Sequence, residues 1–283
     1  MEQSNKYHTH LERKNGWFDM NLKEVWQYRD LIWLFTKRSF VLRYKQTILG
    51  PAWVILQPLM TTLIFTLVFG GIAGISTDGV PQVLFYMGGN AVWSFFAACL
   101  NGTASTFTGN ASVFGKVYFP RLVSPISTVL SSMVNFLIQL AMFLCFWVYY
   151  LVTGQISPNY LGILTLPAIL VYLGLLGLGF GVIVSSLTTK YRDLAMLVSF
   201  GVSLWMYITP VVFPVSTLGN GGLYKLVMIN PVTCAVETFR WAFLGEGAVS
   251  LVYWGVSAAV MALVVFFGVV IFSKVEKTFM DTV

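Results

Sequence analysis

The side chains best suited to acid–base or metal chemistry are few in this 283-residue chain, and they lie far apart in the sequence. Its two histidines, His8 and His10, lie near the amino terminus, and Asp193 and Asp281 are isolated acids. A hydrolytic or metal-assisted reaction would need such groups clustered at one place. The sequence therefore predicts no catalytic site and no metal site, and we expect no cofactor bound by this chain itself.

One segment, residues 109–117, superficially resembles a phosphate-binding loop. Its sequence, GNASVFGKV, has five residues between the two glycines, where that loop has four. Val117 occupies the place of the Ser or Thr that would bind Mg²⁺. We therefore expect that the chain is not an enzyme, and that any ATP and Mg²⁺ are bound and used by a separate partner subunit.

Neutral polar and aromatic side chains recur at helical spacing inside otherwise apolar segments. One face carries Trp53, Gln57 and Thr61. A second carries Tyr86, Asn90, Trp93, Ala97 and Asn101, and we expect Leu84, Ala91, Phe95 and Ala98 on the face opposite to it. A third carries Ser124, Thr128, Ser131, Asn135 and Gln139. Lipid cannot satisfy these groups, so the three faces either contact partner helices or line a watery cavity.

The elements that carry these faces are long and uncharged. The chain is 57% hydrophobic and only 10% charged, with a mean hydropathy of +0.77, whereas charged residues make up about a quarter of an ordinary soluble domain. Crossing a bilayer takes about 20 apolar residues. Six uncharged stretches of 19 to 31 residues predict an all-α integral membrane protein with six transmembrane helices, at about 52–75, 83–107, 122–152, 160–187, 195–213 and 250–272.

The distribution of basic residues predicts the orientation of these spans. Fifteen of the seventeen Lys and Arg residues precede residue 52, lie between spans two and three or four and five, or follow span six. Only Lys225 and Arg240 lie on the other side. The positive-inside rule then places both termini of this multi-pass chain in the cytoplasm. The net charge of +6 thus reflects membrane topology and predicts no nucleic-acid partner.

The chain before the first span divides into two parts. Residues 1–20 are expected to form a cytoplasmic tail, and residues 21–49 an amphipathic helix that starts at Asn21, with Glu24 completing a capping box. Its mixture of aromatic and basic residues is typical of a helix at a membrane surface, although packing on a soluble partner is compatible with it. Gly50-Pro51 then begins the transmembrane domain, 50–273, and 274–283 forms a second cytoplasmic tail.

Local signals also predict details within the spans. Pro58 favours a kink in span one, and Gly177 with Gly181 favours close contact of span four with another helix. Between spans five and six, Asn230-Pro231 is expected to cap a helix of three or four turns that carries Glu237 and Arg240. That helix is too short and too charged to cross the membrane, so we expect it to be re-entrant or interfacial.

The absence of charge inside the spans argues against proton coupling, although unwound backbone could still hold Na⁺. Because the chain also lacks a phosphate-binding loop, we expect the energy source on another chain. An ordered set of short motifs resembles the permeases of type-2 ABC exporters, in the branch that exports O-antigen, teichoic acid and capsular polysaccharides. The similarity extends over nearly the whole chain from about residue 22. It is carried by RYKQTILG at 43–50 with Trp53 and Gln57-Pro58, NAS at 110–112, KVYFPR at 116–121, YRDL at 191–194, YITPVVFP at 207–214, and the segment from Asn230 to Gly245.

The resemblance implies a permease homodimer in the bacterial inner membrane, joined to two ABC nucleotide-binding subunits. Its substrate would be a polysaccharide on a lipid carrier such as undecaprenyl pyrophosphate. Contacts with the ATP-binding subunit would come from Arg43, Lys45, Asn110, Val113, Phe114, Lys116, Phe119, Arg121, Arg192 and Asp193. A periplasmic gate would include Asn230, Pro231, Glu237 and Arg240. The substrate conduit would include Trp53, Gln57, Thr61, Tyr86, Asn90, Trp93 and Asn101.

Two parts of this expectation have physical support of their own. Val113, Phe114 and Phe119 offer apolar side chains beside the basic Lys116 and Arg121, which suits a joint seated in a partner. Aromatic rings and neutral amides can engage the C–H faces and hydroxyls of sugars without tight ionic binding. Two alternatives remain: a type-2 ABC exporter of a drug or lipid, and the membrane subunit of a polysaccharide synthase complex.

Overall fold

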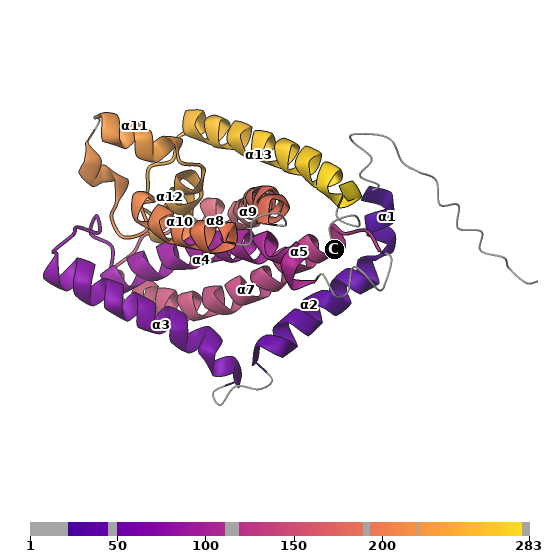
Figure 1. Ribbon diagram of the computed structural model, residues 1–283. Coiled ribbons are helices and arrows are strands. Elements are labelled where there is room, and N and C mark those ends of the chain that lie inside the picture. Colours follow the sequence, from indigo (N-terminus) through magenta and orange to yellow (C-terminus); the bar gives the residue numbers. More distant parts are fainter. Residues whose placement is uncertain (1–21, 45–49, 111–118, 189–192, 220, 279–283) are drawn as a thin grey trace, which may run out of the picture.

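The computed structural model describes residues 22–44, 50–110, 119–188, 193–219 and 221–278, and its regular elements in these ranges are all helical (Figure 1). The predicted all-α fold is thereby confirmed. In chain order the elements are α1 (Leu22–Gln27), α2 (Arg29–Tyr44), η1 (Gly50–Ala52), α3 (Trp53–Phe65), η2 (Thr66–Ile72), α4 (Gln82–Ala104), α5 (Thr106–Gly109), α7 (Val123–Val152), α8 (Tyr160–Ile163), α9 (Leu166–Thr188), α10 (Leu194–Ile208), η3 (Val215–Leu218), α11 (Gly222–Ile229), α12 (Pro231–Leu244) and α13 (Leu251–Thr278).

Five helical segments of the described chain are long and apolar enough to cross a membrane. They cover 53–72, 82–104, 123–152, 160–188 and 251–272, close to five of the six predicted spans. The last helix, α13, continues to Thr278, so part of the predicted tail is helical. In the first segment α3 continues through Pro58, and the departure from α-helix comes later, at the π-helix η2. The structure therefore supports a multi-pass membrane protein.

The remaining apolar stretch forms a shorter helix than predicted. Helix α10 has fifteen residues and ends at Ile208, whereas the uncharged stretch extends to residue 213. Thr209 is extended, with ψ of 141°, because Pro210 disfavours helical backbone in the residue before it. The chain then folds back into the bundle, where Val211 and Val212 are buried. The prediction of a helix through residue 213 was too long.

Helix α4 lies at the centre of the bundle and packs against α3, α7, α9 and α12 (Figure 1). Sixteen of its 23 residues are buried. Its contact with α9 depends on Gly177 and Gly181, where an added Cβ would lie 2.6 Å from Cys99 Cβ and 2.8 Å from the Leu100 carbonyl oxygen, respectively. The predicted close helix contact through this glycine pair is confirmed, because no larger residue fits the space.

Replacing Gly181 with valine is expected to destabilise the bundle by about 1–3 kcal/mol, since α4 and α9 must move apart to admit the side chain. Thermal unfolding of the purified protein in detergent measures this loss. Gly201→Val in α10 is the matched control, because a Cβ there meets nothing within 4 Å. Equal destabilisation by both variants would contradict the assignment of Gly181 to a tight interface.

The amino-terminal helix is divided at Tyr28 into α1 and α2, although Tyr28 N–H still donates to the Val25 carbonyl at 3.1 Å. The predicted single helix is thus two helices joined by one turn residue, and Asn21, its predicted cap, lies outside the described residues. Val25 and Ile32 are buried in an apolar cluster with residues of α7, α9 and α13. Trp26 and Trp33, by contrast, are 69% and 67% exposed, as expected for aromatic anchors at a membrane surface.

Helix α12 has the predicted capped start. The Asn230 side chain accepts a hydrogen bond from Val232 N–H at 3.1 Å, and Pro231 occupies the first turn. Gly245 ends the helix in the left-handed conformation, with φ of 84°, which glycine adopts at little cost. Thirteen of the fourteen residues are buried, so α12 lies inside the bundle rather than on its surface (Figure 1).

Candidate functional site

A pocket of about 610 Å³ lies between α3, α4 and α7, with one residue from α10. Amide, hydroxyl and aromatic side chains from three helices converge on it, and none of the described residues that line it carries a charge. Its lining consists of Trp53, Val54, Gln57, Pro58, Thr61, Asn90, Trp93, Ser94, Phe95, Ala97, Ala98, Asn101, Ser132, Asn135, Phe136, Gln139 and Met206. Concave sites of this size, with polar groups among apolar walls, are typical of ligand binding.

The structure brings six of the seven predicted conduit residues together at this pocket: Trp53, Gln57, Thr61, Asn90, Trp93 and Asn101. Tyr86 is the exception. Its side chain is fully buried among Phe65, Phe69 and Phe85, with ring centroids 5.4 to 6.4 Å away. Because aromatic rings from α3 and η2 cover that end of the α4 face, Tyr86 is a packing residue and its predicted conduit contact is corrected here.

Two residues predicted for the opposite face of α4, Phe95 and Ala98, also line the pocket. At 100° per residue, Ala98 lies only about 80° from Asn90 around the helix axis, so it belongs to the same half of the surface. The pocket extends further around α4 to Phe95, and its other walls come from α3 and α7, which both pack against α4. The polar and apolar faces of α4 therefore meet in one site.

Helix α7 supplies four residues to the pocket. Asn135 and Gln139 belong to the polar stripe that the sequence indicated, whereas Ser132 and Phe136 do not. Their spacing at i and i+4 marks one helix face, but it does not reveal which neighbouring helix that face meets.

The two tryptophans that line the pocket differ in exposure. Trp93 is 4% exposed and packs edge-to-face on Phe96 and Trp205, whereas Trp53 is 46% exposed at the rim.

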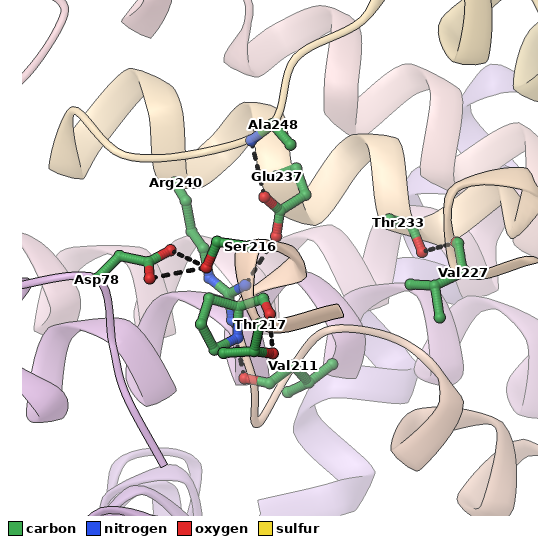
Figure 2. A network of polar contacts seen from close by, with 10 residues as sticks. Asp78, Val211, Ser216, Thr217, Val227, Thr233, Glu237, Arg240 and Ala248 are labelled. Carbon is green, nitrogen blue, oxygen red and sulfur yellow. Dashed lines mark hydrogen bonds and ion pairs between the residues drawn. The ribbon is translucent and has the colours of Figure 1, made fainter. Parts of the chain in front are cut away.

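Two of the predicted gate residues form an ion pair inside the bundle (Figure 2). Arg240 Nη1 lies 2.9 Å from Glu237 Oε1, and the two side chains are only 3% and 4% exposed. Arg240 Nη2 donates to the Val211 carbonyl at 2.9 Å, and Ala248 N–H donates to Glu237 Oε2 at 2.9 Å. The guanidinium also lies 3.7 Å above the centre of the Phe85 ring, which attracts a cation.

This network connects segments that are distant in sequence. Burial lowers the pKa of Arg240, and the adjacent Glu237 carboxylate opposes that shift. Asp78, in the turn between η2 and α4, accepts a hydrogen bond from Ser216 Oγ at 2.8 Å (Figure 2). Asn230 Nδ2 donates to Thr209 Oγ1 at 2.9 Å, which joins the start of α12 to the end of α10. The predicted gate residues thus hold α12 against the chain that follows α10.

The predicted contacts with an ATP-binding subunit are only partly within the described chain. Lys45, Val113, Phe114, Lys116 and Arg192 lie outside the described residues, as does the side chain of Arg43. Asp193 is exposed just before α10, Arg121 is buried, and Asn110 Nδ2 donates to Ser124 Oγ at 3.0 Å.

Phe119 requires a correction within this set. Its side chain is 5% exposed and packs edge-to-face against Phe35 of α2, with ring centroids 5.6 Å apart. Val25 and Ile32 belong to the same buried cluster. Because the amino-terminal helices already cover it, Phe119 packs within this chain and offers no apolar surface to a partner.

Comparison with known proteins assigns the chain to a family. The sequence pattern of the ABC-2 type transporter family matches residues 30–244, more than half of the chain. The O-antigen export system permease protein RfbA of Myxococcus xanthus is 28% identical over 224 residues, which cover 78% of this chain and 83% of that protein. The protein of the same name from Klebsiella pneumoniae is 25% identical over 253 residues, covering 89% and 94%. Because the family match extends over residues 30–244, this chain belongs to the ABC-2 type transporter family.

Proposed function

We propose that this chain is the permease subunit of an ATP-driven exporter that moves a lipid-linked polysaccharide across the bacterial inner membrane. The observation that carries the proposal is the uncharged pocket of amides, hydroxyls and aromatic rings in a chain of this family. Relatives named as O-antigen export permeases match 78% and 89% of this chain and support an O-antigen-like substrate. A carrier such as undecaprenyl pyrophosphate would hold the glycan during export.

The proposed assembly is a permease homodimer with two ABC nucleotide-binding subunits, which bind and hydrolyse ATP. Each permease would have six spans, α10 being the fifth, with both termini in the cytoplasm. Fifteen residues of helix extend about 22 Å, short of a hydrocarbon core of about 30 Å, so the buried chain after Ile208 would complete this crossing. Helix α12 would then be a re-entrant helix on the outer side.

The chemistry of the pocket suits a polymer that must slide. Stacking of a sugar on an aromatic ring is weak, about 1 kcal/mol by analogy with other aromatic contacts. Amides such as Gln57 and Asn90 can donate and accept hydrogen bonds without holding a hydroxyl tightly. Several weak contacts in series would guide a glycan without trapping it.

Deleting the gene for this chain is expected to remove the polysaccharide from the cell surface and trap finished, lipid-linked polymer inside. Extraction and analysis of surface glycan and lipid intermediates measure both quantities, and a plasmid copy of the intact gene should restore export. Finished polymer at the surface of the deletion strain would contradict the proposal. Loss of the polymer itself, with no finished chains inside, would instead indicate a subunit of a synthase complex.

A further inference from the structure

An aromatic cluster behind the pocket wall joins α10 to the rest of the bundle. Trp205 of α10 contacts two rings of α4 edge to face, Phe96 at 5.2 Å and Trp93 at 6.1 Å between ring centroids. It contacts Phe180 of α9 in the same way at 5.6 Å. We infer that Trp205 is a positioning residue for the pocket, because it holds the pocket-lining Trp93 in place without lining the pocket itself. This inference rests on the proposed function, since it assigns a further residue to the same site.

Trp93 is the member of this cluster that reaches the pocket. It is only 4% exposed, so a small edge of its ring forms the wall while the rest is covered by neighbouring side chains. Phe96, which is fully buried, lies 5.5 Å from it and also contacts Trp205. Edge-to-face contacts fix the relative orientation of the rings that make them. The place of the Trp93 edge in the pocket wall therefore depends on the Trp205 ring behind it.

Helix α10 depends on the same residue for its attachment to the bundle. All fifteen residues of α10 lie within the described chain, and Val202 alone among them is buried. The helix packs against α9 and α4 (Figure 1). Trp205 is half-buried, and the next residue, Met206, lines the pocket. Loss of the Trp205 ring would thus loosen α10 and shift Met206 together with Trp93.

A half-buried tryptophan can also join two helices without any part in transport. Trp147 of α7 contacts Phe243 of α12 edge to face at 6.2 Å, and its indole N–H donates to the Phe243 carbonyl at 2.6 Å. Trp147 is outside the pocket lining. If Trp205 only stabilises the bundle, its loss should resemble the loss of Trp147. If it positions the pocket wall, its effect on transport should depend on Trp93.

The test is a double-mutant cycle between Trp205 and Trp93 in the strain that lacks the gene. Plasmid copies carry Trp93→Ala, Trp205→Leu or both, and surface polymer is measured per assembled complex. Each single variant is expected to lower export roughly threefold to tenfold, the range that one aromatic contact is worth. The double variant is expected to match the more impaired single variant, because the two residues act as one unit on the pocket wall.

A conservative variant and a matched control separate positioning from stability. Trp205→Phe keeps an aromatic edge against the same rings and is expected to retain about half or more of the export. Trp147→Leu removes an indole of similar burial, and it should lower thermal stability in detergent at least as much as Trp205→Leu while leaving export per assembled complex unchanged. If Trp205→Leu fails to assemble, Trp205→Met replaces it, because methionine fills more of the space without a ring.

Three results would overturn the inference and leave the proposed function intact. They are losses that multiply in the double variant, normal export by either single variant, and a loss of export per assembled complex in Trp147→Leu equal to that in Trp205→Leu. A different result would overturn the proposed function and the inference with it. In that case the deletion strain holds no finished lipid-linked polymer, and the intact gene on a plasmid restores no export.

Discussion

Replacing Arg240 with methionine is expected to destabilise the protein by about 3–5 kcal/mol, because Glu237 would remain as an unpaired charge in the bundle interior. The substitution also removes the hydrogen bond to the Val211 carbonyl and the contact with the Phe85 ring. Helix α12 would lose its attachment to the chain after α10. Thermal unfolding in detergent and the yield of assembled complex measure the effect.

A double-mutant cycle separates the pair from its individual members. Glu237→Gln alone leaves the Arg240 cation buried without its counter-charge and should also be costly, whereas the double variant removes both charges and should recover part of the loss. Asp30→Asn is the control, because the Asp30 side chain is 97% exposed on α2, outside the network of Glu237 and Arg240. Additive losses in the cycle would show that the pair contributes no coupling energy.

Filling the pocket is expected to stop transport without unfolding the chain. Ser94 and Ala98 are half-buried, one turn apart on α4, and both line the pocket. Ser94→Trp with Ala98→Trp would place two indoles in the space available to a glycan. Export per assembled complex should fall roughly tenfold or more, which corresponds to about 1.4 kcal/mol or more in the barrier to transport.

The control for this variant keeps the substitutions and their spacing. Ala258 and Ala262 are exposed one turn apart on α13, so Ala258→Trp with Ala262→Trp adds the same two rings outside the pocket. Surface polysaccharide and the amount of assembled complex are measured for both variants. Normal export by the filled pocket would rule out this space as the conduit. Equal loss in the control would assign the effect to folding.

The sequence alone predicted features that depend on one segment at a time. Uncharged stretches predicted the bounds of most long helices to within a few residues, because the length and hydropathy of a span are local properties. The capped start of α12 at Asn230-Pro231 follows from groups adjacent in the chain. The fit of Gly177 and Gly181 to another helix was likewise predicted, although the partner, α4, was not.

Contacts between segments were decided only by the tertiary structure. Helical periodicity fixes the angle of a side chain around its own axis, but it does not place the neighbouring helices. On one face of α4, Asn90 therefore opens to the pocket while Tyr86 is covered by rings from α3 and η2. Phe119 is covered by α2 for the same reason. The spacing of Glu237 and Arg240 predicted their proximity, but only packing could bury them and join them to Val211 and Ala248.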